Sequence, residues 1–316
     1  QDIAHVGNSR ALDTGKDACH KGGEVRRVCC NGPLRPWMGV LSPSIFPAVT
    51  DLNTSERSKV VPGEERRSPG LKWLFLPLRW VYKLYFALVF FGSLVVLYIP
   101  FRILLFRPRR YQRAFRLKRA WAFFLQCALG IPLRIERRAA LPKAPYVICC
   151  NHSSYLDIIQ MYNVIPQYFL FIAKYELLNW PLFNIFFKNM NITVNRSDRS
   201  SAAKAFRKVA QAIDRGTSIA MFPEGGIPPF VPRMKPFKDG AFKLAIEKQI
   251  PIVPITFRDH WRLLGEPTEL FSRGRPGISR TIIHPVISTK GLTEADLVTL
   301  RQEVYRIIEE PLLQDQ

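Results

Sequence analysis

Apolar and polar positions beyond residue 140 follow two alternating patterns, which predict a series of strands and helices. Short apolar runs predict buried strands over 145–150, 168–173, 191–194, 217–222, 251–257 and 280–287. Helical spacing predicts helices from residue 154, over 177–187, 201–215 and 237–248, and from residue 293 onward. Because strands and helices alternate, we expect an α/β fold with a mixed, largely parallel sheet flanked by helices. Ligands of such folds bind at the carboxyl ends of the strands.

A long apolar segment precedes the α/β region. Residues 84–101 form a run of eighteen positions without a charge, close to the roughly 20 that a helix needs to cross a bilayer core. A second apolar stretch, 120–131, is too short to span. We therefore favour a two-helix motif at residues 71–131 that associates with the membrane by entering one leaflet, rather than a single span. A buried core helix over 84–101 is the alternative.

Positive charge is concentrated directly after this segment. The chain has 46 Lys and Arg against 25 Asp and Glu, a net charge of +21 that indicates a polyanionic partner. The apolar run is followed by eight basic residues and no acidic one: Arg102, Arg107, Arg109, Arg110, Arg113, Arg116, Lys118 and Arg119. This pattern predicts binding to the phospholipid bilayer at the inner (cytoplasmic) membrane, with the catalytic side in the cytoplasm. Single-stranded nucleic acid is the other candidate polyanion, but the apolar run disfavours it, and we expect no nucleic-acid partner.

The first 70 residues lack a sustained hydrophobic period and are rich in Gly, Pro, Ser and Arg. We expect them to be disordered or a non-native extension, and not a signal peptide, because no apolar h-region follows the early charges. The six cysteines form no C-x-x-C pair. This spacing disfavours a metal site and a disulfide framework, and it indicates a reducing compartment.

The motif N-H-S-S-Y-L-D follows the predicted strand 145–150 directly. His152 at a strand end can reach a substrate, and Asp157 on the opening turn of the next helix can hold one imidazole nitrogen, as a general base requires. Ser154 and Asp157 also match a capping box, in which the carboxylate only satisfies backbone N–H groups. Ser153 and Ser154 adjoin the histidine, but no G-x-S-x-G elbow supports a serine nucleophile.

Polar residues also follow three other predicted strands. Glu224, Gly225 and Gly226 come after strand 217–222, where two glycines let the backbone approach a ligand closely. Arg196 follows strand 191–194 and Lys174 follows strand 168–173. Cations at strand ends suit a phosphate monoester. An ordinary turn and solvated surface charges are the alternatives.

Four blocks in order carry a resemblance to a known family. N-H-S-S-Y-L-D, N-I-T-V-N-R, F-P-E-G-G and P-I-V-P-I-T-F resemble the conserved blocks of the glycerolipid acyltransferases with the H-x4-D motif. Within this family the chain is most similar to bacterial 1-acyl-sn-glycerol-3-phosphate (lysophosphatidic acid) acyltransferases. The resemblance covers residues 71–316 and implies an α/β catalytic domain over 132–316 behind the two-helix motif.

The resemblance implies a reaction and its catalytic residues. His152 would deprotonate the sn-2 hydroxyl of lysophosphatidic acid, and Asp157 would orient and stabilise the imidazole. The hydroxyl would then attack the thioester of acyl-CoA or acyl carrier protein directly, without an acyl-enzyme. The product is phosphatidic acid, and no bound cofactor or metal is implied.

The resemblance also implies the acceptor site, which would consist of Glu224, Gly225, Gly226, Arg196 and Lys174, with the two cations on the phosphate. Many members have Thr where this chain has Gly226, and the block before Arg196 begins with N-M-N in place of Gly. Other acceptors therefore stay open: another lysophospholipid, a lyso-ornithine or lyso-glycine lipid, or glycerol 3-phosphate. A non-catalytic membrane protein that binds anionic lipid is the alternative from a different class.

Overall fold

The computed structural model describes residues 76–179, 182–195, 198–265 and 272–314. The expectation for residues 1–70 lies outside this part. The helices are α2 (Leu76–Leu105), α3 (Tyr111–Ala128), α4 (Leu156–Val164), α5 (Asn184–Asn189), α6 (Arg199–Asp214), α7 (Gly240–Lys248), α8 (His260–Leu263) and α9 (Leu297–Leu313), with 3-10 turns η3 (Pro108–Arg110), η4 (Tyr175–Asn179) and η5 (Glu294–Asp296). The strands are β1 (Leu133–Arg137), β2 (Val147–Cys150), β3 (Phe169–Lys174), β4 (Ile192–Val194), β5 (Ser218–Met221), β6 (Ile252–Phe257) and β7 (Ser279–Ile283).

The described strands form one sheet in the order β1-β7-β6-β2-β5-β3-β4. The five strands from β6 to β4 run parallel, β7 is antiparallel to β6, and β1 is parallel to β7. All residues of β2 and β6 are buried, because these strands are covered on both faces. The prediction of a mixed, largely parallel sheet is confirmed.

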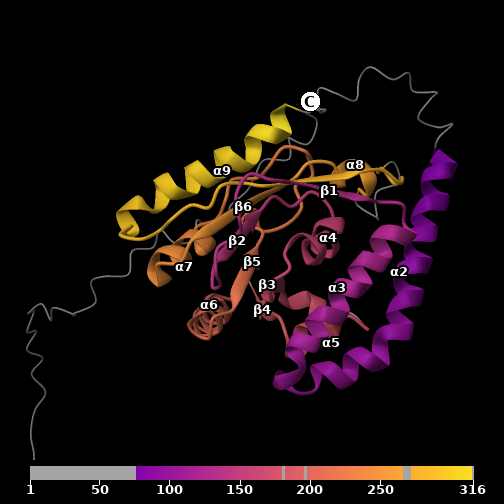
Figure 1. Ribbon diagram of the computed structural model, residues 1–316, viewed down its shortest axis with the longest axis horizontal. Coiled ribbons are helices and arrows are strands. Elements are labelled where there is room, and N and C mark those ends of the chain that lie inside the picture. The colour runs from indigo at the N-terminus through magenta and orange to yellow at the C-terminus, as the bar shows by residue number, and fades with distance from the viewer. Residues whose placement is uncertain (1–75, 180–181, 196–197, 266–271, 315–316) are drawn as a thin grey trace, which may run out of the picture. The chain divides into compact units, whose positions relative to one another are not determined.

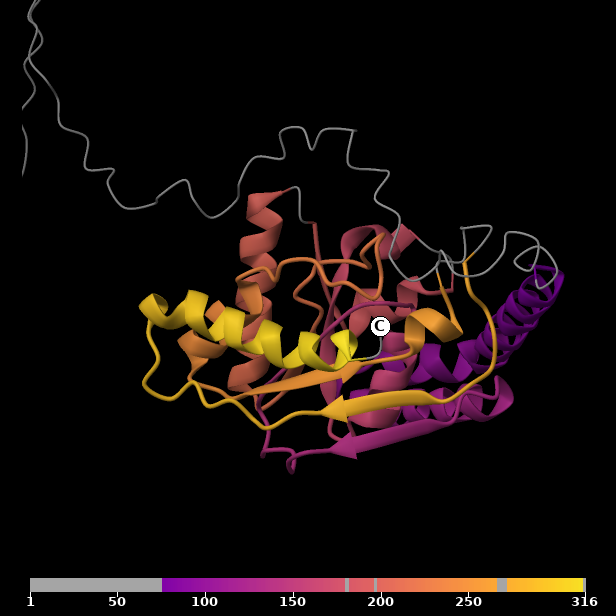
Figure 2. The ribbon, with the colours of Figure 1, turned by 90° about the horizontal axis from the view of Figure 1, so that it is seen from above.

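Helices cover both faces of the sheet (Figures 1 and 2). α6, α7 and α9 lie on one face, and α4 lies on the other with α2 and α3. β2 leads through α4 toward β3, whereas β5 leads through α7 toward β6, so the connections diverge from two neighbouring strands. Their register pairs Cys149 with Met221, which brings the segments after both strands to one edge. Such a switch point is where α/β folds bind ligands.

The sequence pattern misplaced several elements. The predicted helix 177–187 is instead η4 followed by the short α5, and between them Leu182 has a φ of 67°, which a continuing helix does not allow. β7 ends at Ile283, just before His284 and Pro285, because proline has no N–H for the ladder. β1 was not predicted, since it is an edge strand with exposed charged side chains.

The apolar run 84–101 lies within α2, which is long and apolar enough to cross a membrane by length and composition. Only 17% of its apolar 18-residue window is buried. Tyr82 donates a hydrogen bond to the Leu129 carbonyl (2.9 Å), so α3 runs back along α2. The outer faces of α2 and α3 expose large apolar side chains: Leu78, Val81, Leu84, Leu88, Phe91, Val95, Val96, Ile99, Ile103, Phe123 and Phe124. A buried core helix is therefore excluded.

Both ends of α2 contact the α/β domain. Near its beginning, Lys83 donates a hydrogen bond to Ser272 Oγ (2.7 Å). Near its end, the Phe101 and Phe186 rings pack edge to face with centroids 4.9 Å apart. Because a helix that crossed a bilayer would carry its two ends to opposite sides, these contacts favour a hairpin that lies along the domain.

The sequence pattern predicted Lys118 to be one of the basic residues that bind the bilayer, but its side chain is buried. The buried face of α3 consists of Ala114, Phe115, Lys118, Ala122 and Leu125. These positions recur at helical spacing, so the period of the helix points the lysine inward. Lys118 is 4% exposed.

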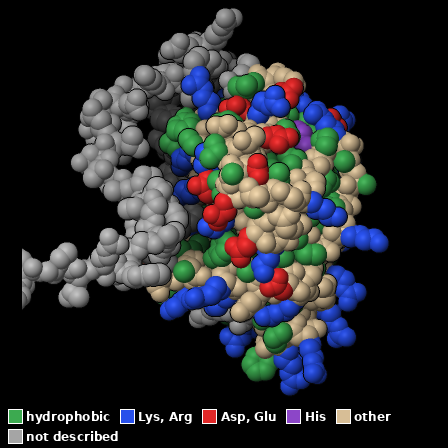
Figure 3. Space-filling model, turned by 90° about the vertical axis from the view of Figure 1, so that its left-hand side faces the viewer, with side chains coloured by type: hydrophobic (Ala, Val, Ile, Leu, Met, Phe, Trp, Pro, Cys, Tyr) green, Lys and Arg blue, Asp and Glu red, His purple; other side chains and the backbone are tan. Residues whose placement is uncertain are grey.

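The side of the domain that carries α6, α7 and α9 has a different surface (Figure 3). Acidic and basic side chains are mixed there, and apolar side chains are scattered among them. Most of the exposed large apolar side chains of the described residues lie on α2 and α3 instead.

Candidate active site

The structure brings His152 and Asp157 together at the end of β2. The Asn151 side chain holds the chain against β6: its Nδ2 donates to the Phe257 carbonyl (3.0 Å) and its Oδ1 accepts from the Phe257 N–H (2.8 Å). His152 follows, and its Nδ1 lies 2.9 Å from Oδ2 of Asp157 in the first turn of α4. Within the described chain the Nε2 of His152 has no hydrogen-bond partner, which leaves it available to a substrate.

Asp157 is a fully buried anion with several donors. Its Oδ2 also accepts hydrogen bonds from the N–H groups of Ser153 (2.7 Å) and Ser154 (2.9 Å). Burial alone raises the pKa of this carboxyl, but hydrogen bonds from two histidines bring the pKa below its ordinary value. Asp157 thus satisfies backbone groups, as the capping interpretation requires, and orients His152 at the same time.

The second histidine is His260 of α8, more than 100 residues along the chain. Its Nδ1 lies 2.5 Å from Asp157 Oδ1, and its Nε2 lies 2.6 Å from Ser279 Oγ on β7. The ring is fully buried. Local sequence holds no signal for this role, because His260 stands outside every motif and reaches Asp157 only through the fold.

We expect His260→Ala to destabilise the fold by about 1–3 kcal/mol, because it leaves buried polar groups of Asp157 and Ser279 without a partner. His260→Asn keeps an N–H donor near the position of Nδ1, so its loss should be smaller. Urea unfolding of the two variants and the wild type measures both values. Equal losses for alanine and asparagine would contradict a specific role for the Nδ1–H donor.

Glu224 connects the segments that follow β2 and β5. It is 3% exposed. Its Oε1 accepts from the His152 N–H (2.7 Å) and its Oε2 from the Lys235 N–H (2.9 Å). Burial raises the pKa of Glu224 to about 7. The next residue, Gly225, has a φ of 81°, a left-handed conformation that favours glycine. Both carboxylate oxygens of Glu224 thus accept hydrogen bonds from backbone N–H groups. The adjacent cavity is lined by Gly225 and Gly226 and not by the Glu224 carboxylate.

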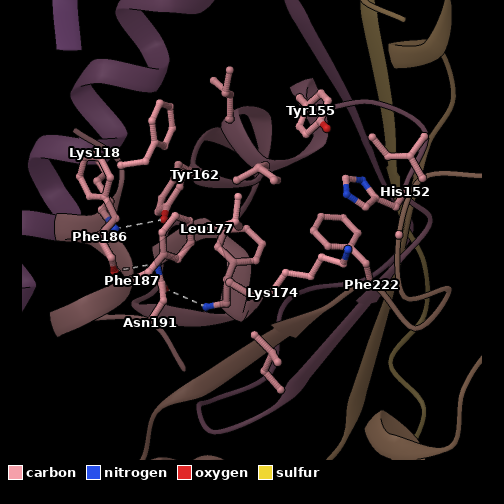
Figure 4. Close-up of a pocket in the computed structure, with 18 of the residues that line it drawn as sticks. Lys118, His152, Tyr155, Tyr162, Lys174, Leu177, Phe186, Phe187, Asn191 and Phe222 are labelled. Carbon is pink, nitrogen blue, oxygen red and sulfur yellow. Dashed lines mark hydrogen bonds between the residues drawn. The ribbon is translucent and has the colours of Figure 1, made fainter. Parts of the chain in front are cut away.

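A cavity of about 560 Å³ opens beside His152. Figure 4 shows His152 and Phe222 at one end of it and Lys118 at the other. The Phe222 ring stacks on the imidazole with centroids 4.0 Å apart, and Phe171 stacks behind Phe222 at 5.9 Å. The stack fixes the plane of the imidazole. Most of the remaining lining is apolar and comes from α2, α3, α4 and the segment around α5, including Phe90, Trp121, Leu125, Ile158, Ile159, Phe183 and Phe187.

Two cations line the cavity near its His152 end. Lys174 at the end of β3 has a side chain that is 59% exposed, and its Nζ lies 3.8 Å from Glu176 Oε1. Lys235, which the sequence did not single out, donates from Nζ to the Ile227 carbonyl (3.2 Å). Arg196 lies outside the described residues. In the described ranges no group of three or more His, Cys, Asp or Glu side chains could hold a metal ion.

Comparisons with known proteins identify the family to which the chain is similar. The Acyltransferase family model matches residues 132–258. The 1-acyl-sn-glycerol-3-phosphate acyltransferase alpha of sheep (Ovis aries) is 30% identical over 238 residues, which cover 70% of this chain and 77% of the relative. The mouse (Mus musculus) protein of the same name is 33% identical over 184 residues, or 54% of this chain and 61% of the relative.

A solved structure has the same fold. The crystal structure of the 1-acyl-sn-glycerophosphate (LPA) acyltransferase PlsC from Thermotoga maritima matches with a TM-score of 0.60 and 22% identity, over 75% of this chain and 95% of that chain. The match to a Caenorhabditis elegans relative, a putative 1-acyl-sn-glycerol-3-phosphate acyltransferase, is 33% identical and covers 56% of that protein. The chain thus spans about six tenths of the length of the mouse and worm relatives.

Proposed function

Because the chain belongs to the acyltransferase family that contains the 1-acyl-sn-glycerol-3-phosphate acyltransferases, we propose that it transfers a fatty acyl group from an acyl thioester to the sn-2 hydroxyl of lysophosphatidic acid. The product is phosphatidic acid, for phospholipid synthesis. The observation that carries this proposal is the His152–Asp157 pair, 2.9 Å apart, at one end of a cavity lined mostly by apolar side chains.

His152 acts as the general base. Asp157 accepts the Nδ1–H bond, which leaves the lone pair on Nε2 for the proton of the sn-2 hydroxyl. As the oxygen attacks the thioester carbonyl, His152 becomes an imidazolium that the buried carboxylate stabilises. The tetrahedral intermediate then expels the thiolate, and the imidazolium returns its proton to that sulfur. One ester bond forms, one thioester bond breaks, and no acyl-enzyme is needed.

The acceptor lies at the His152 end of the cavity. Gly225 and Gly226 let the acceptor approach the backbone, while Glu224 holds the segments after β2 and β5 together through its two backbone hydrogen bonds. Lys174 and Lys235 line this end and supply positive charge for the phosphate. Arg196 stays a candidate for the same role from the sequence pattern.

We infer that the hairpin of α2 and α3 binds the membrane surface and that the site lies beside it. Its exposed apolar side chains enter one leaflet, since both ends of α2 contact the α/β domain. The arginines after residue 101 bind anionic headgroups on the cytoplasmic side. We place the enzyme on the inner (cytoplasmic) membrane, where acyl-CoA or acyl carrier protein supplies the donor.

An acyl-transfer assay tests the proposal by offering lysophosphatidic acid, glycerol 3-phosphate and lyso-aminolipids side by side with both kinds of thioester. We expect phosphatidic acid from lysophosphatidic acid. Thiol release without an acceptor serves as the control for simple hydrolysis. Exclusive acylation of another acceptor would reassign the substrate, and membrane binding without any transfer would identify a lipid-binding protein instead.

A further inference from the structure

The cavity beside His152 has a polar far end. Lys118 lies at the end opposite to His152 (Figure 4), while the lining between them is mostly apolar. A donor whose carbonyl reacts at His152 would extend its acyl chain along this lining toward Lys118. The chemistry at the far end therefore bears on which acyl chain the cavity accepts.

Lys118 is buried without a counterion in the described part of the chain. Its Nζ lies 3.4 Å from the Tyr162 hydroxyl and 3.5 Å from Met190 Sδ, and 4.7 Å from the centre of the Phe186 ring. All three are weak partners for an ammonium group with three N–H donors. Burial lowers the pKa of Lys118 to about 7. An uncompensated buried amine destabilises a fold, so packing alone does not account for it.

Among the described side chains at the far end, hydrogen-bond donors outnumber strong acceptors. Lys118 donates to the Tyr162 oxygen, which leaves the Tyr162 O–H and further ammonium N–H groups for a ligand. The nearby Asn191 side chain adds no acceptor, because its Oδ1 accepts from the Phe171 N–H (3.1 Å) and its Nδ2 donates to the Phe186 carbonyl (3.2 Å). A plain methyl terminus would leave these donors unsatisfied, whereas an oxygen would satisfy them.

We propose that Lys118 and Tyr162 recognise an oxygen substituent, a hydroxyl or keto group, near the far end of the donor acyl chain. This inference rests on the proposed function, in which the cavity holds the acyl chain of a thioester. Lys118 is then a specificity residue remote from the reacting carbonyl, and the enzyme prefers oxygenated acyl groups over plain ones of the same length. The unfavourable burial of its amine is offset only when such a chain is bound.

The test compares unsubstituted and ω-hydroxyacyl-CoA donors over a series of chain lengths, with lysophosphatidic acid as acceptor. For the wild type we expect kcat/KM to favour the hydroxylated donor by about tenfold or more at the best length. Lys118→Met should abolish or reverse this preference and still transfer plain chains, and Tyr162→Phe should weaken it. Lys208→Met removes an exposed lysine of α6, outside the cavity and the hairpin, and should leave the preference unchanged.

Binding supplies a readout that does not depend on turnover. Methyl esters of plain and ω-hydroxy fatty acids, which have no carboxylate to compete for the lysine, are added during thermal unfolding. The hydroxylated ester should raise the Tm of the wild type more than the plain ester, and this difference should vanish in Lys118→Met, which should itself melt higher than the wild type without ligand. Equal kcat/KM values and equal Tm shifts for the plain and hydroxylated chains in the wild type would overturn the inference. A larger Tm shift with the hydroxylated ester but no acyl transfer would overturn the proposed function alone.

Discussion

Replacing His152 with alanine should lower kcat for acyl transfer by roughly 100- to 10,000-fold, the usual contribution of a positioned general base. The physical reason is that the Nε2 lone pair is the acceptor for the hydroxyl proton, while Nδ1 is held by Asp157 at 2.9 Å. Initial rates with saturating lysophosphatidic acid and thioester measure the loss. Binding to anionic vesicles should not change, because the hairpin of α2 and α3 is untouched.

His152→Asn is the matched control for this prediction. The asparagine amide keeps an N–H donor toward Asp157 but has no second nitrogen to accept a proton. It should therefore fold as well as the wild type and be as slow as the alanine variant. Activity near the wild-type level in either variant would rule out His152 as the base and return the histidine to a purely structural role.

Asp157→Asn should lower kcat by roughly 100-fold or more and the free energy of unfolding by about 1–3 kcal/mol. Donors from His152, Ser153 and Ser154 converge on Oδ2, and one from His260 on Oδ1. Asparagine can keep its oxygen toward the first three only by turning its NH₂ toward His260, whose Nδ1 must then lose its proton. The fold survives this exchange, but no negative charge is left to stabilise the imidazolium of His152.

Acid unfolding gives this prediction a second readout. The pKa of Asp157 is lowered in the folded state, so its contribution to stability is present above the ordinary value of about 3.9 and is lost as the pH falls through the folded value. The wild type should thus lose more stability in acid than Asp157→Asn. Asp198→Asn is the control: Asp198 caps α6 through the Ser200 N–H (2.8 Å), and asparagine caps about equally well. If Asp157→Asn turned over normally, the carboxylate would be a cap alone.

The hydrophobic pattern predicted part of the membrane-associating segment. The uncharged run 84–101 predicted a membrane-seeking helix from composition alone, and α2 contains it. The sequence pattern predicted Lys118 to be one of the lipid-binding cations because it lies among arginines. Only the packing of α3 against α4 and α5 distinguishes the buried position from its neighbours, since a difference of one or two residues turns a helical side chain to another face.

The local order of residues was enough to predict the β2 strand and the helix after it. It also made the pairing of His152 with Asp157 a candidate, because a strand end and a first helical turn five residues apart can bring the two side chains together. The order of strands was not predictable in this way. The pairing of β2 with β5 brings Glu224 to the His152 backbone, and the antiparallel β7 together with α8 brings Ser279 and His260 to Asp157. Contacts between distant segments depend on the whole core packing at once, and for that reason the tertiary structure alone decided what surrounds the two catalytic candidates.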